Sequence, residues 1–202
     1  MMKKATSPFG KLARKEDGVT IVEFALVAPV LLLMLVGLLD FGLQMYARAI
    51  VDGAMQDAGR DSSLEPGGPT AAQMDAQVTA RINDLLPSAN VTFTRRNYED
   101  YGDVGAAEEF TDSNGDGICN DNEPFEDMNG NGIWDGDQGR DGRGGASDAV
   151  VYESQTSYGR LFPIDAFINV SPNVVIESTT ILRNQPYSDQ GERIAEAGSC
   201  DV

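Results

Sequence analysis

The longest apolar stretch of the chain lies near its N-terminus. Residues 24–39 contain no charged or strongly polar side chain, and residues 19–39 contain only Thr20 and Glu23 as exceptions. A helix of that length spans about 32 Å, close to the roughly 30 Å hydrocarbon core of a bilayer. The run is apolar on all sides, whereas a core helix of a soluble protein shows one apolar stripe. We therefore expect a transmembrane helix, assigned to residues 19–46.

Helical spacing continues beyond this run. Apolar residues then recur at intervals of three and four, so the helix is expected to leave the membrane with one buried face. These residues are Ala47, Ile50, Val51, Ala54 and Ala58. The Gly- and Pro-rich segment 65–69 ends the helix. A second helix follows, with a capping box at Thr70 and Gln73 at its start and Pro87 after its end.

Alternation of polar and apolar side chains predicts three strands, at residues 90–98, 150–158 and 174–183. An apolar turn or short helix is expected at residues 162–167, between the last two strands. The residues after Pro186 are polar and are expected to form a loose tail. These elements predict an α+β fold with one long N-terminal helix, one shorter helix and a small antiparallel sheet.

Charge is distributed very unevenly along the chain. The formal net charge is −17, yet the first 18 residues carry five basic side chains against two acidic ones. Because basic residues favour the cytoplasmic side of a membrane, this leader is expected in the cytoplasm and the acidic remainder outside. The acidic remainder excludes nucleic acid as a partner, since that binding depends on Lys and Arg. A cleaved secretory signal ending at Ala47-Arg48-Ala49 is the alternative, although the apolar run is long for one.

An acidic segment interrupts the α+β pattern. Residues 99–149 contain fifteen Asp or Glu residues and only two Arg residues, with many glycines. This composition cannot form a conventional core, so the segment is expected to be disordered unless something neutralises it. The chain is thus divided into a leader (1–18), a transmembrane helix (19–46), extracytoplasmic helices with a first strand (47–98), an acidic insert (99–149), and C-terminal strands with a tail (150–202).

The insert contains a calcium-loop motif. Residues 112–123 match D-x-[DN]-x-[DN]-G-x₅-E at every specified position. Calcium takes about six to eight oxygen ligands, which such a loop supplies from short side chains, one carbonyl and a final bidentate glutamate. The expected ligands are Asp112, Asn114, Asp116, the carbonyl of Ile118, Asn120 and Glu123.

A second copy of the loop follows with a period of 15 residues. Its expected ligands are Asp127, Asn129, Asn131, the carbonyl of Ile133, and Asp135. The position of the final glutamate is taken by Gln138, with Asp137 just before it. We therefore expect a weaker site, or one in which Asp137 moves in to complete the coordination.

Further counts restrict the chemistry of the chain. There is no histidine, and there is no Gly-x-Ser-x-Gly nucleophile elbow or phosphate-binding glycine loop, so no enzymatic activity is expected. The two cysteines, Cys119 and Cys200, either form one disulfide in an oxidising compartment or remain unpaired thiols.

A recognisable motif lies where the leader meets the apolar run. Gly18 is followed by four residues and then by Glu23 and Phe24, which resembles a type IV prepilin processing site. The stretch Gly-Val-Thr-Ile-Val-Glu-Phe-Ala-Leu-Val-Ala-Pro and the Leu-rich run after it are similar to the TadE-like family. The resemblance covers residues 15–60, and a weaker likeness to the closing strand of the family lies at 176–184. These proteins are minor pilins or pseudopilins of the tight-adherence (Flp, type IVb) pilus.

This resemblance implies a pilin-like domain and a processing step. A prepilin peptidase would cut after Gly18 and free the amine of Val19, although some members of the family keep their leader. The Glu23 carboxylate of one subunit would then pair with the Val19 amine of its neighbour and fix their register.

The resemblance also implies partners and a location. The partners are the lipid bilayer, other pilins or pseudopilins, the tight-adherence secretion machinery and the prepilin peptidase. The location is the bacterial inner membrane, with the N-terminus in the cytoplasm and the body in the periplasm or in a surface pilus.

The insert resembles a different class of protein. The run from Glu123 to Asp135 is similar to the tandem EF-hand-like calcium repeats of dockerin-type and thrombospondin-type extracellular proteins. In those repeats bound metal and a few apolar side chains replace a core, and here Phe125, Ile133 and Trp134 would be those side chains. Extracellular loops of this kind bind calcium at roughly 10⁻⁴–10⁻³ M, which favours a structural role over a sensor role.

Two functions are compatible with the sequence. The first is a TadE-like minor pilin or pseudopilin with calcium-stabilised loops. The second is a membrane-anchored, calcium-dependent adhesin or surface-binding module that pilus assembly does not require. Processing after Gly18 and loss of pili on deletion favour the first function. An intact leader, intact pili and calcium-dependent surface attachment favour the second.

Overall fold

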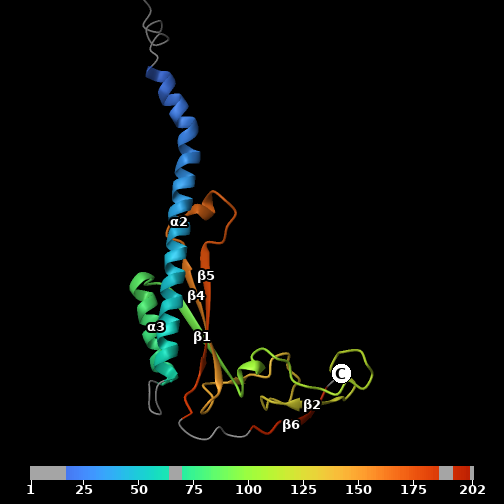
Figure 1. Cartoon of the computed structure of the whole chain (residues 1–202). Helices are drawn as coiled ribbons and strands as arrows, with labels where there is room; N and C mark the ends of the chain where they lie inside the picture. The colour runs from blue at the N-terminus through green and yellow to red at the C-terminus, as the bar shows by residue number, and fades with distance from the viewer. Residues whose placement is uncertain (1–16, 64–69, 187–192, 201–202) are drawn as a thin grey trace, which may run out of the picture. The chain divides into compact units, whose positions relative to one another are not determined.

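The computed structural model describes residues 17–63, 70–186 and 193–200 (Figure 1). The chain divides into two compact units. One unit holds the chain up to Gln44 together with residues 160–172, and the other holds the remainder. The predicted leader falls outside the described residues apart from its last two residues. The turn predicted at residues 65–69 also lies outside them.

The long helix α2, Asp17–Ser63, begins in the first unit and continues into the second. Its apolar side chains are exposed along the N-terminal part, from Ile21 at 70% to Leu39 at 60%. Among the described residues it is the one helix long and apolar enough to cross a membrane. Pro29 lies within it, which membrane helices tolerate. The expectation that the helix extends past the apolar run is confirmed.

The C-terminal part of α2 packs beside α3, Ala71–Leu85 (Figure 1). The buried side of α2 consists of Ala47, Val51, Ala54, Met55 and Ala58, and that of α3 consists of Met74, Val78 and Ile82. The predicted capping box is confirmed: the Thr70 N–H donates to the Gln73 side chain at 2.7 Å, and the Gln73 N–H donates to the Thr70 hydroxyl at 3.3 Å.

Four antiparallel strands form the main sheet in the order β3-β1-β4-β5. Their bounds are β1 Asn90–Tyr98, β3 Arg140–Asp141, β4 Ala149–Gly159 and β5 Asn173–Arg183. The three strands predicted from alternation are therefore confirmed. One face of the sheet packs on the two helices through Tyr152, Tyr158, Val174 and Ile176.

The two ends of the acidic insert lie side by side on the main sheet, because Tyr98 at the end of β1 pairs directly with Ala149 at the start of β4.

The structure also has two short helices. The helix η1, Tyr101–Asp103, follows β1, and η2, Ile164–Ala166, lies between β4 and β5 where an apolar turn or short helix was expected. The α+β prediction for the whole chain is confirmed.

A second, two-stranded sheet joins β2, Pro124–Asp127, to β6, Glu196–Ser199. The expectation of a loose tail after Pro186 is wrong for β6. These residues lack an alternating apolar pattern, so no local signal predicts a strand there. The strand forms because the edge of β2, distant in sequence, offers its backbone groups for pairing.

Candidate functional site

The predicted processing residues lie in the first turns of α2. The helix begins at Asp17, so the backbone of Gly18 and Val19 is already helical. Glu23 and Phe24 are exposed on the helix, Phe24 at 65%. The glutamate is thus presented on the surface of the apolar segment, where a neighbouring helix can reach it.

The first predicted metal loop is closed by two carboxylates that accept backbone N–H groups. Asp112, at position 1, accepts Gly115 N–H at 2.6 Å and Gly117 N–H at 2.9 Å. The other carboxylate is Glu123 at position 12. It accepts the N–H groups of positions 2, 3 and 9, which are Ser113 at 2.6 Å, Asn114 at 3.3 Å and Asn120 at 3.4 Å.

Amide side chains lie between the remaining carboxylates of this loop. The amides of Asn114 and Asn120 donate to the Asp116 carboxylate at 3.1 and 2.9 Å. The Asn120 amide, with Ile118 N–H and the Asn114 amide, holds the pKa of Asp116 below its ordinary value. Gly117, at position 6, has φ 76°, a left-handed conformation that glycine adopts without strain.

The second loop repeats this geometry. Asp127 accepts Gly130 N–H and Gly132 N–H, each at 2.6 Å, as Asp112 does 15 residues earlier. Asn129 and Asn131 both donate their amides to Asp135, at 2.7 and 2.6 Å. The predicted ligands of this loop therefore lie together around one turn.

Glu108 takes the place of the missing glutamate in the second loop. It is 2% exposed and accepts the N–H groups of positions 2, 3 and 9 of that loop. These are Met128 at 2.8 Å, Asn129 at 3.3 Å and Asp135 at 3.0 Å. Glu123, which is 3% exposed, makes the same three bonds in the first loop. The loop motif does not predict Glu108, because the motif places its glutamate at the end of the loop and Glu108 precedes both loops.

The two loops are related by a 15-residue repeat that is visible in the sequence. Glu108-x-Phe110 precedes the first loop, and Glu123-x-Phe125 precedes the second. Each repeat therefore supplies the glutamate that closes the loop of the other. Matching backbone bonds join the repeats: Thr111 N–H to Pro124 O and Glu126 N–H to Glu109 O, both at 2.9 Å.

Asp137 and Gln138, the residues predicted to complete the second loop, make other contacts. The Gln138 N–H donates to Ala106 O at 2.9 Å. Asp137 is paired with Arg96 and accepts the Tyr98 hydroxyl at 2.9 Å. Burial acts to raise the pKa of Asp137, but hydrogen bonds from Tyr98, Gly139 and Arg96 outweigh it and lower the pKa.

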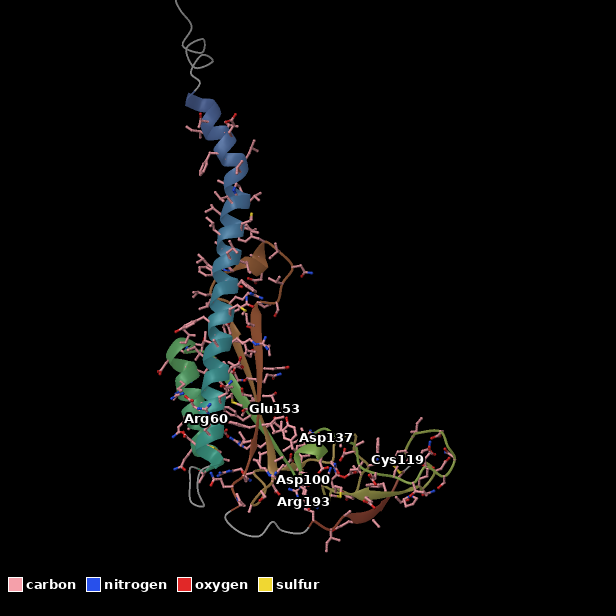
Figure 2. All side chains as sticks on the ribbon, in the orientation of Figure 1. Arg60, Asp100, Cys119, Asp137, Glu153 and Arg193 are labelled. Atoms are coloured by element: carbon pink, nitrogen blue, oxygen red, sulfur yellow. A yellow bond between two sulfur atoms is a disulfide. The ribbon has the colours of Figure 1, made fainter. Side chains whose placement is uncertain are left out.

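Asp137 still borders the second loop. One open cavity of about 470 Å³ is lined by Arg96 and by oxygen-bearing residues of this region. Those residues are Asn129, Asn131, Asp135, Asp137 and Asp141. Figure 2 shows Asp137 beside the part of the insert that adjoins the main sheet.

A small cluster of aromatic rings supports the loops. Phe110 meets Trp134 edge-to-face at 5.7 Å, and the Trp134 Nε1–H donates to Glu108 O at 2.9 Å. Phe125 is 3% exposed and Trp134 is half-buried against Phe110, so both pack within the insert as expected. Ile133 is 67% exposed, so the expectation that it packs into the insert is wrong.

A disulfide joins the first loop to β6. Cys119 and Cys200 are bonded, with their Cα atoms 5.4 Å apart and a separation of 81 positions in sequence (Figure 2). Backbone bonds flank the disulfide, since Cys200 N–H donates to Glu123 O at 2.8 Å and Asn122 N–H donates to Cys200 O at 3.0 Å. The loop-closing Glu123 is therefore held from both sides.

Within the described ranges, no group of three or more His, Cys, Asp or Glu side chains is arranged so as to hold a metal ion by itself. The amides that bond to Asp116 and Asp135 separate the carboxylates of each loop. The donor set of each loop consists of Asp, Asn and Glu oxygens, which suits a hard cation such as calcium and not zinc.

The first part of the chain has a family match. Residues 18–60 match the family model described as TadE-like protein, which covers nearly all of α2. No curated protein and no solved structure matches the chain. Residues 18–60 therefore form a TadE-like domain, which supports a role connected with the tight-adherence pilus.

Proposed function

We propose that the chain is a membrane-anchored minor pilin or pseudopilin of a tight-adherence pilus. The observation that carries this proposal is the TadE-like match at residues 18–60, on a helix whose apolar side chains are exposed. The helix anchors the chain in the bacterial inner membrane with the basic leader in the cytoplasm. The α+β body then lies outside, and the role is structural and not enzymatic.

Glu23 is the residue through which the chain would join other pilins. A carboxylate in an apolar segment costs about 2.5–3.5 kcal/mol on insertion scales, so it is expected to serve a function. Cleavage by a prepilin peptidase after Gly18 frees the amine of Val19, a cation that can pair with Glu23 of a neighbouring subunit. The exposed position of Glu23 on α2 supports this pairing.

Membrane insertion and assembly can be tested separately on this residue. Cells expressing Glu23→Ala should place the chain in the membrane fraction as before, but less of it should co-purify with sheared pili. Thr20→Ala, which removes the other polar side chain of the apolar run, is the matched control. Equal co-purification of Glu23→Ala and Thr20→Ala would refute the assembly role of Glu23.

The insert is proposed to bind calcium in both loops. The first loop would use Asp112, Asn114, Asp116, the Ile118 carbonyl, Asn120 and Glu123. The second would use Asp127, Asn129, Asn131, the Ile133 carbonyl and Asp135, with Glu108 in place of Asp137 or Gln138. The support is the identical backbone bonding of Glu108 and Glu123, which gives the two loops the same frame.

Calcium would serve a structural role in the periplasm or outside the cell. Two ions would offset four of the negative charges concentrated in residues 99–149. Affinities of roughly 10⁻⁴–10⁻³ M would keep the loops filled at environmental calcium levels. The disulfide agrees with an oxidising compartment.

Calcium binding is best measured on the whole chain in detergent, because the disulfide and β6 tie the insert to the C-terminus. Isothermal titration should show uptake at millimolar calcium, with thermal stabilisation of the protein. Absence of heat and of any melting shift at millimolar calcium would remove the calcium proposal. It would leave the pilin proposal intact.

A calcium-dependent adhesin is the second candidate function. The observation that favours it is a pair of exposed apolar side chains at equivalent positions of the loops, Ile118 at 61% and Ile133 at 67%. A strain carrying Ile118→Ser with Ile133→Ser should assemble pili normally under either function. Loss of calcium-dependent attachment in that strain would support the adhesin, and unchanged attachment would count against it.

A further inference from the structure

The connection between β4 and β5 exposes an apolar surface in the same unit as the N-terminal part of α2. Residues 160–172 belong to that unit, and Figure 1 shows them beside the helix. Leu161 is 68% exposed, Phe167 is 74% exposed and Ile168 is 42% exposed. Exposed apolar side chains that lie close together on a loop indicate a surface that binds a membrane or another protein.

An ion pair fixes this connection to the helix. Arg160 pairs with Asp40, and their side chains are only 13% and 4% exposed. The Gln44 amide also donates to the Asp40 carboxylate, at 2.6 Å. Arg160 also joins the two ends of the connection. Its side-chain Nε donates to Ser171 O at 2.7 Å, and its backbone N–H donates to Pro172 O at 3.0 Å.

The point of attachment marks the end of the apolar run. Asp40 follows Leu39 directly, so the connection is fixed where the hydrocarbon-spanning part of α2 ends. Pairing with Arg160 offsets the charge of Asp40, and the apolar surface of the helix continues at Phe41 and Tyr46, 61% and 56% exposed. An aromatic side chain with a hydroxyl, such as Tyr46, is typical of a membrane–water interface.

We propose that residues 160–172 lie in the outer interface of the bilayer, with Leu161, Phe167 and Ile168 inserted among the lipid headgroups and upper acyl chains. This inference rests on the proposed membrane anchor. A lipid surface is favoured over a protein partner because the Asp40–Arg160 pair fixes the connection, with its exposed apolar side chains, to α2 directly after the apolar run.

The backbone of the connection is suited to this environment. Several of its N–H groups donate to carbonyls within the connection, which matters where water is scarce. Ile164 donates to Phe162 O at 2.8 Å, and Phe167 and Ile168 both donate to Ile164 O at 3.0 Å. Asp165 is exposed, so its carboxylate keeps the insertion shallow, at the depth of an interfacial segment.

Depth-dependent quenching of tryptophan fluorescence tests the proposal on the full chain in phosphatidylcholine–phosphatidylglycerol vesicles. Phe167→Trp reports the connection, and the emission of the parent chain, which contains Trp134, is subtracted. Lipids brominated near the headgroup should quench Trp at position 167 more than lipids brominated near the bilayer centre. Leu32→Trp, in the middle of the apolar run, should show the opposite order.

The two variants separate the possible failures. If Leu32→Trp is quenched and Phe167→Trp is not, the interfacial location is refuted while the anchor stands. A blue-shifted but unquenched Phe167→Trp would show that protein covers the connection, which also refutes the lipid proposal. If Leu32→Trp itself is not quenched, the membrane anchor fails.

A separate measurement tests whether the Asp40–Arg160 ion pair places the connection. Arg160→Gln in the Phe167→Trp background should reduce quenching by the shallow brominated lipids. The same change in the Leu32→Trp background should leave quenching by the deep brominated lipids as before. Undiminished shallow quenching in Arg160→Gln would show that the Asp40–Arg160 pair does not place the connection.

Discussion

Glu108 and Glu123 are buried carboxylates whose charge is balanced chiefly by backbone N–H groups. Each accepts three such bonds within the opposite repeat of the insert. Hydrogen bonds to an ionised group are stronger than neutral ones, so these six bonds hold the two loops in the same conformation. Each glutamate thus binds its own repeat to the other repeat of the insert.

Replacing Glu108 with glutamine should weaken calcium binding at the second loop. The amide lacks the charge and the bidentate geometry of the carboxylate, so the affinity of one site should fall by about tenfold or more. Isothermal titration of the full chain is the measurement. Glu109→Gln is the matched control, since Glu109 is the exposed neighbour and offers only its backbone to the loops.

The alternative assignment predicts a different result for the same titration. If Asp137 completes the second site, Asp137→Asn should reduce its affinity and Glu108→Gln should behave like the Glu109→Gln control. That outcome would overturn the assignment of Glu108.

Asp137 should make stability depend on pH in the acid range. Burial acts to raise its pKa, but hydrogen bonds from Tyr98, Gly139 and Arg96 lower it below the ordinary value of 3.8. Burial and Asp137 raise the pKa of Tyr98 to about 12, so its hydroxyl remains a donor at neutral pH. A carboxyl with a lowered pKa stabilises the fold above its unfolded pKa, and this contribution is lost as the pH falls.

We therefore expect the melting temperature to fall as the pH is lowered from about 4 towards the lowered pKa of Asp137. The melting temperature of the Tyr98→Phe variant should fall less over this pH range. Asp137 in that variant lacks the hydrogen bond from the Tyr98 hydroxyl, which is one of the bonds that lower its pKa. Melting by circular dichroism in detergent measures both proteins, with Tyr101→Phe, an exposed tyrosine, as control. Identical pH profiles for all three proteins would contradict the role of the Tyr98–Asp137 bond.

At the scale of elements, the insert is organised by contacts between residues far apart in sequence. β2 pairs with β6, and the disulfide joins Cys119 to Cys200 across 81 residues. Gly198 lies directly on the ring of Phe125, where a side chain would collide with it. β6 therefore depends on the insert, and the insert depends on β6.

Breaking the disulfide should loosen this sheet and spare the other. A bond that closes so long a segment contributes about 2–4 kcal/mol, chiefly by restricting the unfolded chain. In Cys119→Ser with Cys200→Ser, backbone amides of β2 and β6 should exchange hydrogen faster, while those of β4 and β5 keep their protection. Unchanged exchange in β2 and β6 would show that strand pairing alone holds the insert together.

The sequence predicted the elements whose signals are local. β1, β4 and β5 alternate over nine to eleven residues, and α3 has its capping residues within one turn. β6 carries no such signal because it forms only against β2. The role of Glu108 could not be predicted from the calcium-loop motif, although the 15-residue repeat is visible in the sequence. The motif places its glutamate at the end of the loop, whereas Glu108 precedes the second loop in the chain.

At the scale of the whole molecule, the apolar residues and the acidic residues are concentrated in different parts of the chain. An apolar helix with a TadE-like match comes first, and an α+β body with a strongly acidic insert follows. The whole chain has a net charge of −17 although its first 18 residues are basic, so the strongly acidic body would stay soluble by itself and would repel other copies of it. Calcium in the loops would reduce this repulsion, which is an advantage for a subunit packed into a pilus.

The most direct test of the proposed function is a count of surface pili in a strain that lacks this chain. The strain is complemented either with the full chain or with the body from Met45 onward exported behind a cleavable secretory signal. Pili should be lost on deletion, return with the full chain, and not return with the unanchored body. Normal pili in the deletion strain would contradict the proposed function.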